Sequence, residues 1–228
     1  MRNIKNLFLA ILISMFSSSF ALAEYTMGVS AGLAHIDASG TETEGGEKNH
    51  HSVNHFTAVG SIFVEANNLG GSGFSLGVDY VPMTADVSDK VKKRTDTELS
   101  VTGTVNHTST SRSQSAQAEL NDHLTIYAMQ EVGDLYFKLG YVMVDLETTE
   151  SLATGSAYGN VDLSGILVGA GTEFDFGNNA IGRIEFSHTA YDNISLQSSA
   201  TRAGVSPNNL IEADLDVTQL KASVGYRF

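Results

Sequence analysis

The chain has 228 residues, a formal net charge of −13 at pH 7, no Cys and no Trp. So acidic a chain is a poor match for nucleic acid, because phosphate contacts require Lys and Arg. Without Cys it cannot form disulfides, so its stability must come from packing or from a closed, hydrogen-bonded sheet.

The first 23 residues have the organisation of a secretory signal peptide. Arg2 and Lys5 supply a positive segment, residues 7–20 form a mainly apolar segment, and a small-x-small cleavage sequence ends at Ala23. The apolar segment is shorter than the ~20 residues that a membrane-spanning helix needs. We therefore expect export, cleavage after Ala23, and one domain over residues 24–228.

The rest of the chain is organised as alternating stretches of apolar and polar residues, separated by Gly, Asn, Asp and Ser. A period of two residues is typical of strands with two different faces. We expect eight strands, at about residues 25–35, 54–64, 73–81, 120–130, 135–146, 161–174, 180–189 and 215–228. The pattern leaves open which way the side chains of the second strand face.

The connections between these strands alternate strictly between short and long. A transmembrane barrel has short turns at one end and long loops at the other, whereas a soluble sandwich has no reason for such sorting. Aromatic residues also fall near both strand ends, as two interfacial girdles would require. One girdle would contain Tyr25, Phe63, Phe74, Phe137, Phe174, Tyr226 and Phe228, and the other Tyr80, Tyr141, Phe186 and Tyr191. The expected fold is all-β, an eight-stranded antiparallel up-and-down transmembrane β-barrel.

Charged residues alternate with the apolar residues of several predicted strands. An eight-stranded barrel has an interior that side chains can just fill. We expect an interior ion-pair network that joins Lys138, Arg183, Lys221 and Arg227 to Asp79, Glu173 and Glu185. The alternative is that these residues form the solvated face of a soluble sheet.

The C-terminal strand resembles the last strand of bacterial outer-membrane proteins. Its apolar face consists of Leu220, Ala222, Val224, Tyr226 and Phe228. Residues 165–174 and 183–186 also resemble strands of the small outer-membrane β-barrel domain family, a porin-family group that includes the OmpA-barrel, OmpX and opacity types. The resemblance implies an outer-membrane location, contact with lipid and lipopolysaccharide, and assembly by periplasmic chaperones and the barrel assembly machinery. It implies no cofactor.

Two groups of residues could carry chemistry. His50, His51 and His55 are weak candidates for a metal site, since imidazole binds Zn²⁺ or Cu²⁺ but their spacing matches no structural zinc motif. His107 and His188 are weak candidates for a general base in a lipid A-modifying enzyme. Alternation places His188 and Ser187 on opposite faces of a strand.

The expected function is a non-enzymatic one, either structural or in surface interactions through the long loops. Residues 82–119 retain some period-two pattern, so we expect a hairpin that protrudes from the barrel and could contact a surface partner. The first alternative is a channel for small solutes or hydrophobic molecules, as in OmpW-like barrels. The second is the lipid A-modifying enzyme.

Overall fold

The computed structural model describes residues 4–17, 24–44, 47–88, 91–102, 106–151, 157–199 and 209–228. Helix α1 (Ile4–Ser17) is followed by β1 (Glu24–Glu44), β2 (Glu47–Asn67), a 3-10 turn (Leu69–Gly71), β3 (Phe74–Val81), β4 (Ala85–Asp86), β5 (Lys92–Thr102), β6 (Asn106–Val132), β7 (Leu135–Ser151), β8 (Val161–Gly177), β9 (Ala180–Tyr191), β10 (Ile194–Gln197) and β11 (Leu210–Arg227). In the described part of the chain, no helix has both the length and the apolar character needed to cross a membrane.

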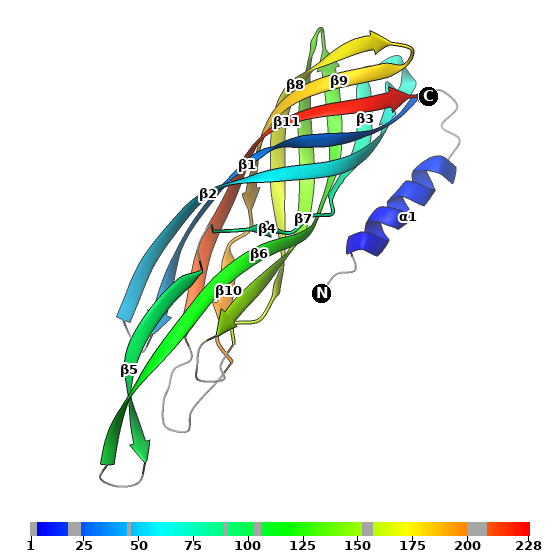
Figure 1. The fold of residues 1–228 in the computed structure, drawn as a ribbon. Coiled ribbons are helices and arrows are strands. Elements are labelled where there is room, and N and C mark those ends of the chain that lie inside the picture. The colour runs from blue at the N-terminus through cyan, green and yellow to red at the C-terminus, as the bar shows by residue number, and fades with distance from the viewer. Residues whose placement is uncertain are drawn as a thin grey trace.

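The strands form a closed antiparallel ring in the order β1-β2-β3-β6-β7-β8-β9-β11 (Figure 1). The ring closes because β11 pairs with β1 from Arg227 opposite Thr26 to Leu210 opposite Thr43. Strands β4 and β5 pair with β6, and β10 pairs with β11, so these three lie outside the ring order. The predicted eight-stranded barrel is confirmed.

Short connections after β2, β6 and β8 lie at one end of the barrel, which we call the turn end. Residues that tolerate a left-handed backbone make these connections tight. Gly133 has a φ of 64° between β6 and β7, and Asn178 and Asn179 have φ values of 54° and 65° between β8 and β9. The opposite end, which carries the long connections, is called the loop end.

The strands are much longer at the loop end than the sequence predicts. Residues 36–53 were expected to be a loop, but β1 and β2 pair continuously up to Glu44 opposite Glu47. The prediction failed because these residues are polar on both faces, so no apolar period marks them. The hairpin expected within residues 82–119 is confirmed, since β5 pairs with β6 from Lys92 to Thr102.

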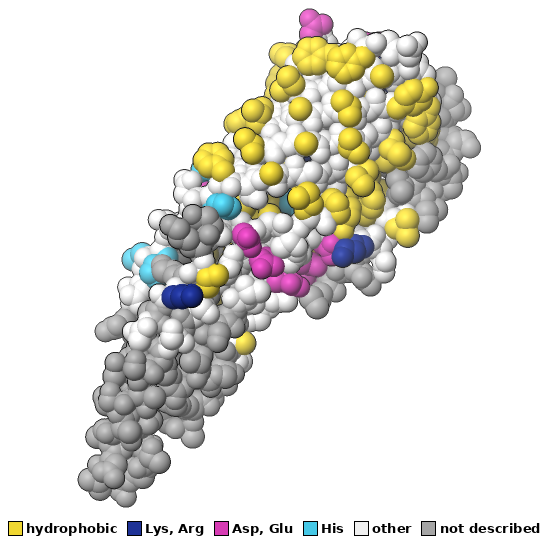
Figure 2. Space-filling model, viewed as in Figure 1, with side chains coloured by type: hydrophobic (Ala, Val, Ile, Leu, Met, Phe, Trp, Pro, Cys, Tyr) yellow, Lys and Arg dark blue, Asp and Glu magenta, His cyan; other side chains and the backbone are white. Residues whose placement is uncertain are grey.

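The outer wall near the turn end is apolar (Figure 2). Large apolar side chains that are more than half exposed there include Val29, Leu33, Phe137, Leu139, Ile166, Val168, Phe186, Leu220, Val224, Tyr226 and Phe228. Further toward the loop end, the surface carries Asp, Glu, His and Lys side chains (Figure 2). An apolar band next to a polar surface is typical of a barrel wall of which only part faces lipid.

Two residues of the expected aromatic girdles lie inside the barrel instead. Phe63 is 3% exposed and Tyr191 is 8% exposed. Phe63 lies on β2, whose facing could not be decided from the sequence. Tyr191 and Glu185 are an even number of residues apart on β9, so both side chains face the lumen. The alternation around the outward-facing Phe186 does predict this position for Tyr191.

Helix α1 lies against the outside of the wall. Phe8 stacks on Tyr80 with ring centroids 5.0 Å apart, and Ile4 packs in the same cluster with Leu124 and Met143. Those three wall residues face outward by register, so α1 rather than a core buries them. Ala23, where we expect cleavage, lies outside the described residues.

Candidate functional site in the barrel lumen

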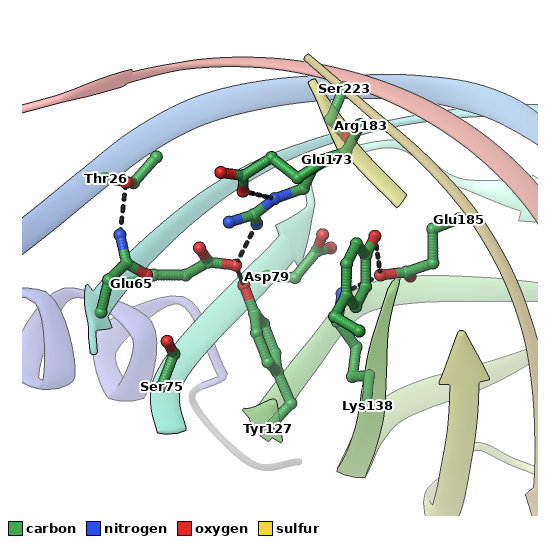
Figure 3. Close-up of polar contacts among 12 residues, drawn as sticks. Thr26, Glu65, Ser75, Asp79, Tyr127, Lys138, Glu173, Arg183, Glu185 and Ser223 are labelled. Atoms are coloured by element: carbon green, nitrogen blue, oxygen red, sulfur yellow. Dashed lines mark hydrogen bonds and ion pairs between the residues drawn. The ribbon is translucent and has the colours of Figure 1, made fainter. Parts of the chain in front are cut away.

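The lumen at the turn end is filled by charged side chains (Figure 3). All seven residues of the expected network lie here, and Glu65 joins them. Arg183 Nη1 lies 2.6 Å from Glu65 Oε1, and Arg183 Nε lies 2.7 Å from Glu173 Oε2. Arg227 Nη2 lies 2.5 Å from Glu173 Oε1, so Glu173 bridges two arginines.

A second chain of contacts surrounds Lys221. Its Nζ lies 3.2 Å from Asp79 Oδ2 and 3.8 Å from Glu185 Oε1. Glu185 also forms an ion pair with Lys138. Ser61 donates a hydrogen bond of 2.9 Å to Asp79 Oδ2. The two sets of contacts together link side chains of β2, β3, β7, β8, β9 and β11 across the lumen.

Two tyrosines close the remaining space. Tyr127 donates a 2.5 Å hydrogen bond to Glu65 Oε1, and Tyr136 donates one of 3.1 Å to Glu185 Oε2. Each ring fits because a glycine faces it: a Cβ at Gly77 would lie 2.5 Å from the Tyr127 ring, and a Cβ at Gly171 would lie 2.5 Å from the Tyr136 ring. The alternation of β6 and β7 places both tyrosines inside. Glu65 was missed, because the sequence suggested that it belonged to a turn.

The lumen at the loop end is apolar, which the sequence did not indicate. Its buried residues are Ala34, Ile36, Val87, Leu120, Val142, Val144, Leu146, Leu163, Leu167, Tyr191, Ile194, Leu196, Leu215 and Val217. Val87 and the β10 residues Ile194 and Leu196 come from the long connections, which fold inward over the barrel. The lumen therefore has a charged half and an apolar half.

The wall is interrupted beside this apolar half. On its β3 side, β2 is paired only from Ile62 to Ala66 in the described chain. β3 ends at Val81, and the next residue, Pro82, has no N–H with which to continue a ladder. The chain resumes pairing at Ala85, but with β6 rather than with β2. On the edge that faces away from β1, residues 47–61 of β2 thus have no described strand partner.

This interruption between β2 and β3–β4, which we call the gap, extends to the level of the apolar outer wall. Ala58 on β2 lies opposite Leu33 on β1, which is 58% exposed on the outer face. Met83 lies at the gap: its Sδ is 3.4 Å from the position of a Cβ added to Gly60. A small cavity of about 30 Å³ lies on the inner side, between the gap and His123.

The metal-site candidates do not converge. His50 and His51 are neighbours on β2, so their side chains face opposite sides, and His55 is about 13 Å along the strand from His51. His50 Nδ1 lies 2.8 Å from Thr41 Oγ1. In the part of the chain that the structure describes, no three His, Asp or Glu side chains are placed to hold a metal ion.

The enzyme candidates are also separated. His188 faces outward, with Nδ1 3.0 Å from Thr218 Oγ1, whereas Ser187 is buried inside the barrel. The side chain of His107 lies outside the described residues. The geometry therefore does not bring His188 and Ser187 together.

A barrel filled in this way should not conduct ions along its axis. We expect purified, refolded protein to give no steady openings in planar-bilayer recordings, because paired charges and apolar side chains occupy the lumen at successive levels. A refolded Arg183→Ala variant, which removes the central cation, should show more transient current than the parent. Steady, ion-selective openings of the parent would contradict a closed axis.

A closed eight-stranded ring with an apolar wall and a filled lumen is the fold of small outer-membrane β-barrel proteins. The structure is similar to that of the outer membrane protein OprG from Pseudomonas aeruginosa, with a TM-score of 0.55 and 12% identity over 90% of this chain and 96% of that one. The outer membrane protease OmpT from Escherichia coli gives a TM-score of 0.47 and 11% identity over 90% and 97% of the two chains. Ail from Yersinia pestis gives 0.40 and 14% over 90% and 99%.

At these identities the likeness to OprG shows a shared fold and does not extend to activity. No family model matches the sequence, and no curated protein sequence matches it.

Proposed function

We propose that the protein is an integral, non-enzymatic outer-membrane β-barrel that is closed along its axis and passes small apolar molecules sideways into the bilayer. The observation that carries the proposal is the gap between β2 and β3–β4, which lies beside the apolar half of the lumen and at the level of the apolar outer wall.

The outer wall has the height that a membrane location requires. On β7 the outward side chains are apolar from Leu135 to Met143, about nine residues, and a tilted spanning strand needs ~9–11. The predicted signal peptide supplies the export route. Lipid and lipopolysaccharide would surround this band.

The route of an apolar molecule follows from the different chemistry of the two halves of the lumen. An apolar molecule that enters from the loop end gains by contact with Ile36, Leu120 and Val217. It would have to displace paired charges to continue along the axis, which is unfavourable. The gap at Met83 offers an apolar exit at the height of the bilayer instead.

The unpaired backbone at the gap also requires a physical explanation. Irregular backbone at membrane depth is tolerated only where protein covers it or where it lines a cavity. The 30 Å³ cavity and the Met83 side chain provide such a lining. A simple structural barrel would gain stability by continuing the β2–β3 ladder across this level.

A surface-interaction role is a second candidate. The β1–β2 and β5–β6 hairpins extend well past the apolar wall, since β1 and β2 each have 21 residues. Strand edges without a partner among the described residues, such as the second edge of β5, can pair with another chain. The two roles are compatible, because they use different ends of the strands.

Entry of the fluorescent apolar amine N-phenyl-1-naphthylamine into cells that produce the protein tests the passage. We expect several-fold faster entry than into cells without it, faster entry still with Met83→Ala, and slow entry with Met83→Trp, whose ring would fill the gap. Met27→Ala, a change at an exposed Met elsewhere on the wall, is the matched control. Equal entry with and without the parent protein would overturn the proposal.

A further inference from the structure

On the basis of the proposed passage, we infer that the cavity behind the gap is a binding site for an apolar molecule with one hydrogen-bonding group, and that His123 holds this group. The cavity lies on the inner side of Met83 and is lined by residues of β1, β2, β3, β4, β6, β9 and β11. Most of its lining is aliphatic, with Ile36, Val59 and Leu120 among the contacts.

His123 has a fixed position in this lining. β6 has a register shift between Asn121 and Leu124, and Asp122 has a φ of 52° there. Asp122 Oδ1 accepts a hydrogen bond of 2.7 Å from the outward-facing Tyr80 hydroxyl, which anchors the bulge to the wall. The residue after Asp122 is thereby turned into the lumen, level with Val81 of β3.

The imidazole has one nitrogen in use and one without a partner. His123 Nε2 lies 3.0 Å from the Tyr191 hydroxyl, whereas His123 Nδ1 is buried and has no hydrogen-bond partner. A neutral imidazole has one donor and one acceptor nitrogen. The Tyr191 hydroxyl can either donate or accept a hydrogen bond. If Nε2 donates to it, Nδ1 can accept a hydrogen bond from a ligand, and if Nε2 accepts from it, Nδ1 can donate one. A buried polar atom without a partner is costly, so a ligand that satisfies it is favoured.

The ligand class follows from these contacts. An aliphatic lining selects an apolar body, and a single unpaired imidazole nitrogen selects one hydroxyl, amine or carbonyl group. A charged molecule is disfavoured, because the cavity lining contains no Asp, Glu, Lys or Arg to pair with it. The site therefore fits compounds such as phenols, alcohols and aldehydes with an aromatic or short aliphatic body.

The cavity must open to admit such a molecule. Its 30 Å³ is about the volume of one water molecule in the liquid. Met83 is the residue that can move, because it is 48% exposed and its unbranched side chain has several rotatable bonds. Binding should therefore displace Met83 from the gap, which couples occupancy of the site to opening of the wall.

The test uses 1-naphthol and naphthalene, two probes of nearly equal size of which only the first has a hydroxyl. The protein, labelled with ¹⁵N in its seven histidines, is refolded into lipid bilayers and titrated while the imidazole ¹⁵N resonances are recorded. We expect one resonance to move with 1-naphthol and to stay in place with naphthalene. That resonance should be missing in His123→Phe and present in His188→Phe, which changes an outward-facing histidine.

His123→Gln keeps a hydrogen-bonding group and should retain weaker 1-naphthol binding, which separates loss of the contact from loss of the fold. The inference is overturned if no imidazole resonance responds, if naphthalene moves it equally, or if the response is lost in His188→Phe instead. N-phenyl-1-naphthylamine entry that still depends on Met83 would then show that the passage stands without this site. Loss of both results would overturn the passage as well.

Discussion

Replacing Arg183 by Met is expected to lower the free energy of unfolding by about 3–5 kcal/mol, the range found when one partner of a buried ion pair is removed. Arg183 is 5% exposed and contacts Glu65, which is fully buried, and Glu173. The substitution leaves Glu65 with a Tyr127 hydrogen bond but without a counter-charge. Equilibrium unfolding by urea in lipid vesicles measures the change.

Lys93→Met is the matched control for this prediction. It removes a cation from an exposed position on β5, so its effect should be small. The double variant Arg183→Met with Glu65→Leu should be more stable than Arg183→Met alone, because it removes the unpaired charge as well. If Arg183→Met unfolds at the same urea concentration as Lys93→Met, the buried network does not stabilise the barrel.

Placing an arginine on the outer wall is expected to have the second largest effect. Leu139 is 59% exposed at the middle of the apolar stretch of β7. A charge near the bilayer midplane destabilises an outer-membrane barrel by about 2–4 kcal/mol, so Leu139→Arg should lower the free energy of unfolding by that amount. Unfolding in vesicles and the fraction refolded, seen as a gel-mobility shift, both report the change.

The control for Leu139→Arg is Ser52→Arg, on an exposed part of β2 beyond the apolar wall. Outside the bilayer, an added arginine should change the free energy of unfolding by less than about 1 kcal/mol. Equal effects of the two substitutions would mean that the apolar wall does not face lipid.

Much of this fold could be predicted because lipid-facing strands impose a strict alternation on the sequence. β7, β8 and β11 carry that alternation clearly, and the same parity places Lys138, Glu173 and Lys221 inside the barrel. The polar hairpins beyond the wall could not be predicted in this way. Their two faces both meet water, so pairing leaves no apolar period.

The candidate site was only partly visible in the sequence. Glu65 follows an apolar run on β2 and precedes a turn, so alternation did not decide its facing. The gap depends on where β3 stops pairing and where β4 resumes. Pro82 marks the first of these points, but the second depends on tertiary packing. The unpaired His123 nitrogen likewise arises from the bulge at Asp122, and no local sequence pattern predicts that bulge.

The most direct test of the sideways passage is a reversible lock across the gap. The chain has no Cys, so Gly60→Cys and Met83→Cys introduced together are the only pair that can form a disulfide within one chain. The Met83 side chain reaches across the gap, since a Cβ at Gly60 would lie 3.4 Å from Met83 Sδ. The disulfide forms if the Cβ atoms of residues 60 and 83 come within about 4.5 Å of each other. Each single-Cys variant serves as a control that cannot form the internal bond.

The measurement is the rate of N-phenyl-1-naphthylamine entry into cells that carry the double variant, under oxidising conditions and again after reduction. We expect slow entry while the disulfide is closed, recovery once it is reduced, and no redox dependence in either single variant. Equal rates before and after reduction, with the disulfide shown to have formed, would contradict passage between β2 and β3–β4.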